Sequence, residues 1–371
     1  MSDILFIDTE ASLLPFLATI HAGDTLAADT EFLRERTYHA RLCLVQLAVG
    51  GRIACIDPLA GMDLEPLWQC FDRTELTLHA ARQDLEVLLG AAGRLPGRIF
   101  DTQVAAALCG YPAQIGYASL VRELLGIDLG KHHTRTDWSR RPLSGEQLAY
   151  AADDVRYLEE MRTILSDRLA QLGRLDWAVA DSNELLDPTL YEPAPETAWQ
   201  RLKGLARMDE RSAAAAAALA VWREREALRA DRPRQWILKD AALIALAQSR
   251  PSSRQALADT QGVPAGLARR AGDQLLQVIG RAGPSPVLAR GAPSAAEKAL
   301  VAEMSGVVRG KAEELGIEPE LIASRKDLRR AAGGGNGLRA LSGWRGELVG
   351  EALAALLGKR PQSSTAETSR S

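Results

Sequence analysis

The sequence has few cysteines, and their spacing is irregular. Only four occur among 371 residues, with no CxxC pair: Cys43, Cys55, Cys70 and Cys109. Cysteine-based zinc sites and the disulfide frameworks of secreted domains need closely and regularly spaced cysteines, so this distribution argues against both. Each cysteine lies in an apolar stretch, where a free thiol behaves as a small buried hydrophobe. We therefore expect four buried free thiols.

Long apolar runs are also missing. The longest, such as residues 213–221, are far shorter than the roughly 20 residues that a helix needs to cross a bilayer. The first thirty residues include Asp3, Asp8, Glu10 and Asp24, where a signal peptide would be basic and then apolar. We therefore expect a cytoplasmic protein without a membrane span.

The net charge is small, −3, but it is unevenly distributed. Residues 1–193 contain 17 Lys and Arg against 29 Asp and Glu, residues 194–290 contain 16 against 9, and residues 291–371 contain 12 against 10. A basic segment after an acidic half favours a polyanionic partner, although such charge also simply keeps helical domains soluble.

The first half of the chain alternates patterns typical of strands and of helices. Short runs of strand length occupy residues 4–7, 26–29, 42–49, 52–56 and 76–79. Helical periodicity is found in residues 12–20, 63–71, 81–92, 102–109, 118–125 and 144–171. The pair Gly50-Gly51 predicts a hairpin, so part of the sheet should be antiparallel. We expect an α/β domain over residues 1–190, with a mixed sheet covered by helices.

The second half is predicted to be helical, as expected for a chain long enough for two or three domains. A proline-rich stretch at residues 187–195 predicts a linker. The helical patterns that follow, with Asp240 as the N-cap of the second, cover residues 211–230, 240–248 and 267–279. After a second break rich in Pro, Gly and Ser comes a helical block, residues 295–357. We expect domains at residues 194–283 and 291–360, and a disordered end at residues 361–371.

Three acidic segments carry the candidate chemistry. Asp29 and Glu31 flank Thr30 at the end of a strand, so their carboxylates point the same way and repel unless a cation lies between them. Carboxylate oxygens are the ligands that Mg²⁺ and Mn²⁺ prefer. Such pairs also occur at strand ends that simply face water, so this segment alone does not establish a site.

The other two segments are weaker when taken singly. Asp84 follows the strand at residues 76–79 near a helix start, where a carboxylate also merely complements the helix dipole. Tyr150 and Asp154 are four residues apart on a predicted helix and share a face, which suits a metal ligand beside a group that positions water. Asp153 is turned away from them. The same pattern fits a core tyrosine and a surface charge equally well.

Together, the three segments resemble the motifs of the DEDD exonuclease superfamily, tyrosine branch, in the order DxE, Asp and YxxxD. The flanking sequence over most of residues 20–170 resembles bacterial ribonuclease D, in Phe32, Arg34, Thr37-Tyr38, Leu44-Val45-Gln46-Leu47-Ala48, His79, Phe100-Asp101-Thr102-Gln103, Arg135-Thr136-Asp137-Trp138 and Arg141-Pro142-Leu143. The segments around Trp199, Trp222 and residues 231–240 resemble an HRDC domain, and residues 295–357 resemble a second, degenerate copy. The resemblance implies a ribonuclease H-like α/β exonuclease domain followed by all-α HRDC domains.

The same resemblance implies a 3′-to-5′ exoribonuclease that uses two divalent metal ions, Mg²⁺ or Mn²⁺. Asp29 would bridge both ions, Glu31 and Asp154 would hold the one that activates water, and Asp84 would support the other through its solvent shell. Tyr150 would orient the attacking water. The implied substrates are RNAs with a single-stranded 3′ end, tRNA precursors among them. The implied products are 5′ mononucleotides. A monomer is the default expectation.

Two alternatives stay open at this point. The same carboxylates serve DNA-directed 3′-to-5′ exonucleases of the Werner type, although the chain has no GKS/T P-loop of a helicase. A non-catalytic RNA-binding protein with a vestigial acidic site is the other alternative.

Overall fold

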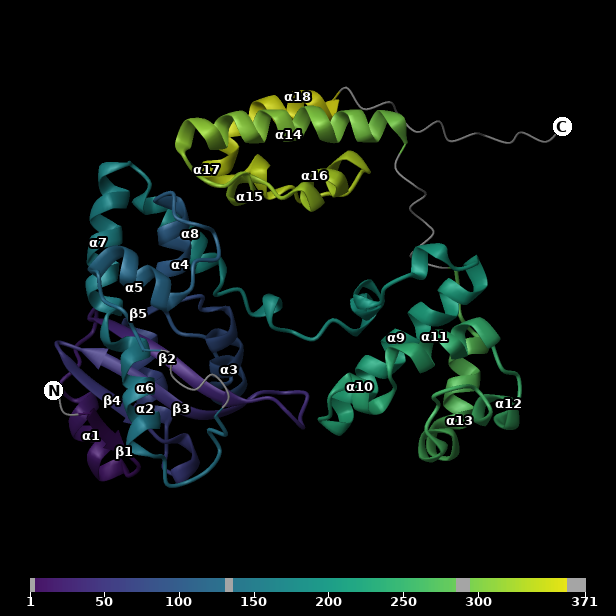
Figure 1. The fold of residues 1–371 in the computed structure, drawn as a ribbon, viewed down its shortest axis with the longest axis horizontal. Coiled ribbons are helices and arrows are strands. Elements are labelled where there is room, and N and C mark those ends of the chain that lie inside the picture. Colours follow the sequence, from purple (N-terminus) through teal and green to yellow (C-terminus); the bar gives the residue numbers. More distant parts are fainter. Residues whose placement is uncertain (1–3, 131–135, 285–293, 359–371) are drawn as a thin grey trace.

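The computed structural model describes residues 4–130, 136–284 and 294–358, which form an α/β domain and two helical modules (Figure 1). Among these residues, no helix combines the length and apolar character that spanning a bilayer requires. All four cysteines are free; three are buried and Cys109 is partly buried, so the expectation of buried free thiols is confirmed for three of them. The expected disordered end at residues 361–371 lies outside the described residues.

A six-stranded mixed sheet forms the centre of the α/β domain, in the order β1-β4-β3-β2-β5-β6. Its strands are β1 (Ile4–Ile7), β2 (Thr25–Leu33), β3 (Arg41–Val49), β4 (Arg52–Ile56), β5 (Glu75–Leu78) and β6 (Arg98–Asp101). The β2–β3 and β3–β4 pairs are antiparallel and the other three pairs are parallel, so the predicted mixed sheet is confirmed. Gly50 and Gly51 both have positive φ, as a tight hairpin turn requires. The sequence analysis missed β6.

Helices cover both faces of the sheet. On one face, Leu26, Ala28 and Leu47 pack in a core with α1 (Glu10–Leu17), α2 (Glu65–Arg73) and α3 (Arg82–Ala92). On the other face, Ala27 and Ala48 pack with α4 (Thr102–Leu108), α5 (Tyr117–Leu125), α6 (Gly145–Arg156) and α7 (Leu158–Gln171). Because side chains alternate along β2, Asp29 and Glu31 point to the second face and Thr30 to the first.

The single helix predicted over residues 144–171 is in fact two helices, α6 and α7. Tyr117 explains the break, because its hydroxyl donates to the Asp153 carbonyl (2.7 Å) and accepts from the Tyr157 backbone N–H (3.4 Å). These are the carbonyl and amide that a continuous helix would pair with each other. A further helix, α8 (Leu175–Glu184), was not predicted.

The first helical module contains five helices around its own core. They are α9 (Glu210–Ala230), α10 (Arg234–Ile237), α11 (Asp240–Ser249), α12 (Arg254–Ala258) and α13 (Ala265–Gly280). The prediction of Asp240 as an N-cap was wrong, since Lys239 occupies the cap and Asp240 is the first helical residue. Its carboxylate accepts instead from Arg223 (2.6 Å).

The second helical module packs on the α/β domain and shares a core with it. Its α-helices are α14 (Ala295–Leu315), α15 (Pro319–Ile322), α16 (Arg325–Ala332), α17 (Gly343–Arg345) and α18 (Glu351–Gly358). Trp344 stacks on Trp177 of α8 with ring centroids 4.5 Å apart. The domain boundaries at residues 190, 194, 283, 291 and 360 stay predictions.

Candidate active site

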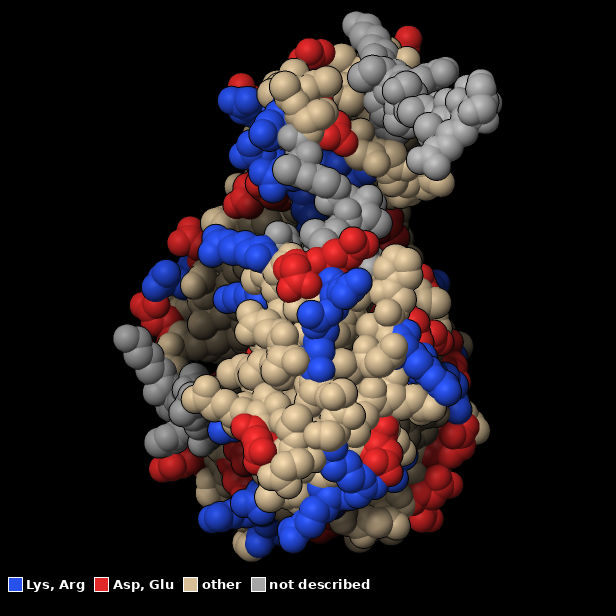
Figure 2. Space-filling model, turned by 90° about the vertical axis from the view of Figure 1, so that its right-hand side faces the viewer, with Lys and Arg blue, Asp and Glu red and all other residues tan. Residues whose placement is uncertain are grey.

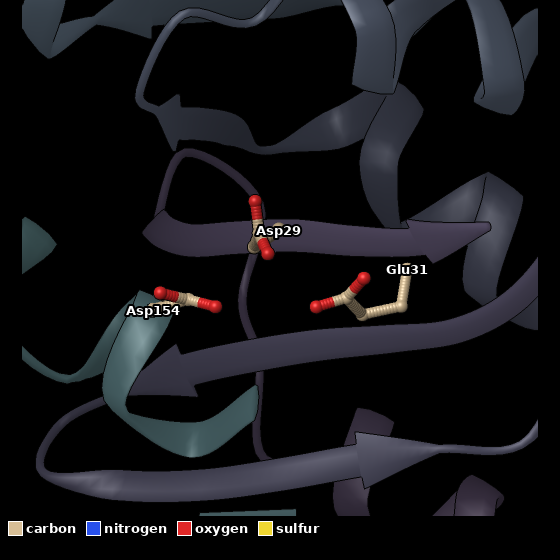
Figure 3. Close-up of side chains that lie close together, drawn as sticks. All are labelled: Asp29, Glu31 and Asp154. Atoms are coloured by element: carbon tan, nitrogen blue, oxygen red, sulfur yellow. The ribbon is translucent and has the colours of Figure 1, made fainter. Parts of the chain in front are cut away.

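Strand β2 presents Asp29 and Glu31 to helix α6, which carries Asp154. One carboxylate oxygen from each of the three residues lies within 4.8 Å of the other two. Figure 3 shows Asp29 and Glu31 on the strand and Asp154 on the helix, with their carboxylates around a common space. The structure therefore brings together three of the predicted metal ligands, although they come from elements more than a hundred residues apart in the sequence.

Helix α6 also brings Tyr150 to this space. Tyr150 and Asp154 share a helix face, and the phenol and the carboxylate lie close enough for each to shift the pKa of the other. The neighbouring Asp153 faces elsewhere and forms an ion pair with Arg156 (2.7 Å). The two adjacent aspartates therefore differ in surroundings, and only Asp154 joins the cluster.

Asp84 approaches from the other face of the sheet. It lies in the first turn of α3, and its carboxylate accepts from the Thr30 hydroxyl (2.6 Å) and the Thr30 backbone N–H (3.2 Å). It is 7% exposed and does not belong to the group of three, but its charge raises the pKa of Asp29. This placement suits a carboxylate that acts through water. The sequence analysis did not identify Thr30 as its partner.

The turn before α3 is a second feature that the sequence analysis missed. Ala80 has a φ of 56°, a left-handed conformation that alanine rarely adopts. The Asp101 carboxylate at the end of β6 accepts from the backbone N–H groups of Ala80 (3.1 Å) and Ala81 (2.8 Å). These bonds stabilise the strained turn and so set where Asp84 begins its helix. Asp101 belongs to the segment that resembles ribonuclease D, which was its only sequence signal.

Burial raises the pKa of every carboxylate in the site and is the largest cause in each case, and repulsion from neighbouring carboxylates adds to it. The pKa rises to about 8 for Glu31, about 7 for Asp154 and about 6 for Asp84. The pKa of Asp29 is raised well above its usual value by burial and then by the charges of the other three carboxylates. Such a group ionises fully only when a cation neutralises it.

These residues fit a divalent cation. Three converging carboxylates supply the hard oxygen ligands that Mg²⁺ and Mn²⁺ prefer. Gln46 pairs with Asp29 across β2 and β3 and is fully buried, yet its amide has no hydrogen-bond partner among the described residues. Divalent cations of this kind keep several bound water molecules. The unpaired Gln46 amide beside Asp29 can form hydrogen bonds with such water.

A cavity of about 370 Å³ lies against helix α6, on the side of Tyr150 and Asp153. Its lining includes Tyr150, Trp138, Ser144 and Gln147. The Trp138 and Tyr150 rings are neighbours, with centroids 6.1 Å apart. Tyr150 therefore borders both the acidic cluster and a partly aromatic space, where part of a substrate can lie.

Known proteins resemble the chain over nearly its whole length. Residues 4–170 match a family model described as 3′-5′ exonuclease, and residues 212–279 match the HRDC domain. The chain is 40% identical to Ribonuclease D of Gluconacetobacter diazotrophicus over 95% of this chain and 93% of that protein. It is likewise 40% identical to Ribonuclease D of Acidiphilium cryptum, over 96% and 93% of the two chains.

A solved structure matches as well. The crystal structure of Escherichia coli RNase D, an exoribonuclease involved in structured RNA processing, superposes with a TM-score of 0.87 at 32% identity, covering 97% of this chain and all of that one. The predicted exonuclease domain followed by a helical HRDC domain is thereby confirmed, and neither the DNA-directed nor the non-catalytic alternative is favoured. The chain belongs to the ribonuclease D family, and it is a 3′-to-5′ exoribonuclease.

Proposed function

We propose that this exoribonuclease trims the 3′ ends of structured RNAs, tRNA precursors among them, through two divalent cations held by Asp29, Glu31, Asp84 and Asp154. The observation that carries the proposal is the convergence of Asp29, Glu31 and Asp154. When bound, Mg²⁺ or Mn²⁺ lowers the pKa of water and stabilises negative charge on the phosphate and the leaving oxygen. Asp84, behind the strand, would act through water.

Tyr150 orients the attacking water in this proposal. Burial is the main reason that its pKa lies above the ordinary value, and the charges of Asp154 and Glu31 add to it. The phenol therefore stays protonated at neutral pH, so it donates a hydrogen bond and does not act as a base. Its side chain lies beside Asp154, one of the proposed ligands.

The first helical module would hold the RNA body. The segment that contains it has 16 Lys and Arg against 9 Asp and Glu. Figure 2 shows the side of the molecule on which this module lies, where Lys and Arg side chains form several separate groups. Phosphate contacts of this kind make binding sensitive to salt. The proposed state is a monomer in the cytoplasm, where bacterial tRNA precursors occur; sedimentation and cell fractionation test both.

End-labelled RNA digestion tests the site. Asp29→Asn should abolish cleavage while RNA binding survives, because a metal ligand is lost but the RNA-binding surface is unchanged. Asp72→Asn is the matched control, since this surface carboxylate on α2 pairs with Arg94 and is not part of the cluster, so its loss should leave turnover nearly unchanged. Full activity of Asp29→Asn at saturating metal would refute the assignment.

Calorimetry tests the number and kind of ions. Titration with Mg²⁺ and with Mn²⁺ should show two binding events in the wild-type protein and weaker binding in Asp29→Asn. Binding of a single ion, even with RNA present, would contradict the two-ion mechanism. It would not contradict the exonuclease activity itself.

A further inference from the structure

Trp236 is the most exposed of the large hydrophobic side chains in the described part of the chain. It is 58% exposed, whereas the next, Leu14, is 50% exposed. It lies on the short helix α10, where its backbone N–H donates to the Pro233 carbonyl (2.8 Å) and Ile237 beside it is buried. No ring contact or side-chain hydrogen bond of Trp236 is found within residues 4–130, 136–284 and 294–358. The short helix α10 thus presents the indole of Trp236 to solvent.

Unpaired cations flank this indole. Arg232 and Lys239, on either side of α10, are exposed and have no ion-pair partner among the residues described. Arg234, between them, pairs only loosely with Glu224 (3.7 Å). An exposed aromatic ring among free positive charges is the combination with which proteins bind single-stranded nucleic acid, by stacking on bases and contacting phosphates.

The same place is joined to the catalytic domain. The loop between β2 and β3 reaches the first helical module beside α10 (Figure 1). There the backbone N–H groups of Tyr38 and His39 both donate to Asp231 (3.0 Å each), and the Tyr38 hydroxyl donates to Glu224 (2.7 Å). These bonds hold the C-terminal end of α9, just before α10, against the continuation of the strand that carries Asp29 and Glu31.

The distance to the active site is short. Arg36 on this loop is exposed, without an ion-pair partner in the described chain, and follows Glu31 by five residues. Five extended residues span at most about 17 Å, which a few nucleotides of single-stranded RNA can bridge. The cations of the loop and of α10 therefore lie within reach of an RNA whose 3′ end is in the active site.

We propose that Trp236, Arg232, Lys239 and Arg36 form a binding site for a single-stranded RNA segment a few nucleotides upstream of the 3′ end. An unpaired base stacks on the indole, and the adjoining phosphates contact the three cations. Paired bases hide their faces in the helix, so the site selects single-stranded over duplex RNA. The inference deepens the proposed function, because it rests on the first helical module holding RNA.

Binding of labelled RNA to the full-length protein tests this site, in the Asp29→Asn background so that the RNA stays intact. Trp236→Ala should weaken binding of single-stranded RNA roughly tenfold to a hundredfold, the effect of losing one stacked base. Trp236→Tyr keeps a ring and should retain most of the affinity, while Trp236→Leu should behave like alanine. Binding of blunt duplex RNA should change little in all three. Leu172→Ala, at another exposed apolar residue (48%), should bind like the parent protein.

Kinetics in the protein with Asp29 intact give an independent readout. Trp236→Ala should raise KM for a single-stranded substrate and leave kcat nearly unchanged, since the residue contacts RNA away from the reacting phosphate. Unchanged affinity and KM in Trp236→Ala, with weakened binding in Arg232→Ala and Lys239→Ala, would overturn the stacking site alone. Unchanged binding in all these variants would overturn the RNA-holding role of the module as well.

Discussion

Thr30 shows how one side chain between two catalytic carboxylates can set the position of a third. Its hydroxyl and backbone N–H both donate to the buried Asp84. We predict that Thr30→Val, nearly equal in shape, lowers the free energy of unfolding by about 1–3 kcal/mol, because Asp84 loses its shorter hydrogen bond in a buried place. Turnover should fall as well, because Asp84 gains freedom to move. Urea unfolding and single-turnover cleavage measure the two effects.

Thr77 on the adjacent strand β5 offers a matched control. It is fully buried, and its hydroxyl has no hydrogen-bond partner in the described part of the chain. Thr77→Val should therefore be neutral or slightly stabilising, since it removes an unpaired polar group. Equal losses of stability in Thr30→Val and Thr77→Val would contradict the proposed role of the Thr30 hydroxyl.

The raised carboxylate pKa values predict an unusual pH dependence for the metal-free protein. Unfolded carboxyls lose their protons near pH 4, whereas in the folded protein the pKa rises to about 6 for Asp84, about 7 for Asp154 and about 8 for Glu31. Between about pH 4 and pH 8 the folded state holds more protons, so these groups stabilise it at low pH and their contribution is lost as pH rises. Metal affinity should rise over the same range, because the ion competes with protons.

Chemical unfolding with a chelator present, at several pH values, measures this dependence. The double substitution Asp29→Asn with Asp154→Asn removes two of the four interacting charges, so its stability should vary less with pH than that of the wild type. If the wild-type and doubly substituted proteins share one pH profile, the cluster does not govern the dependence.

Local sequence patterns predicted which carboxylates share a face of the site, but not the hydrogen bonds that position Asp84. Alternation along β2 correctly placed Asp29 and Glu31 on one face, and helical spacing placed Tyr150 with Asp154. The bonds from Thr30 to Asp84 and from Ala80 to Asp101 join residues 54 and 21 positions apart. No local periodicity encodes such pairs, because they depend on which strands become neighbours.

At the level of helices and strands, local patterns succeeded where an element has one buried face. β1 and β4 have the predicted bounds, and the Gly-Gly hairpin formed. The division of residues 144–171 into α6 and α7 escaped prediction because Tyr117, from another helix, inserts its hydroxyl between Asp153 and Tyr157. Strand β6 was missed because only Ile99 and Phe100 are apolar in it, between the charged Arg98 and Asp101.

Helix α6 depends on its first turn to present Tyr150 and Asp154. The Ser144 hydroxyl accepts from the Gln147 backbone N–H (3.2 Å), and the Gln147 side chain accepts in return from the Ser144 N–H (2.8 Å). Ser144→Ala should cost about 1 kcal/mol of stability, the usual value of such a cap. The substitution should also reduce turnover. Without the cap the first turn of α6 frays, and Tyr150 lies in the next turn.

A second helix of the chain provides the control for that prediction. Ser294 caps α14 in the same way with Glu297, far from the carboxylate cluster in the sequence and in another module. Ser294→Ala should cost similar stability without lowering turnover. If both variants lose the same fraction of activity, the effect of Ser144 on the site is only general destabilisation.

On the scale of the whole molecule, the two helical modules join the catalytic domain by different kinds of contact. The first meets it through the hydrogen bonds of the β2–β3 loop to Asp231 and Glu224. The second shares an apolar core with it and encloses a charge: Asp181 on α8, 8% exposed, accepts from Arg345 (2.6 and 2.7 Å), Trp344 (3.0 Å) and Arg339 (2.8 Å). The second junction should therefore be the more rigid.

Asp181→Asn tests what holds the second module in place. The amide keeps the size of the carboxylate but leaves Arg345, 3% exposed, without its counter-charge, and breaking a buried pair in this way costs about 3–5 kcal/mol. We expect a lower unfolding temperature and earlier proteolysis of the second module, residues 294–358, with cleavage of short single-stranded RNA retained. Glu184→Gln is the matched control, because Glu184 pairs with the same Arg339 while 54% exposed, and a surface pair contributes at most about 1 kcal/mol. Equal stability of the two variants would show that the shared apolar core alone fixes the module, with the buried charge adding nothing.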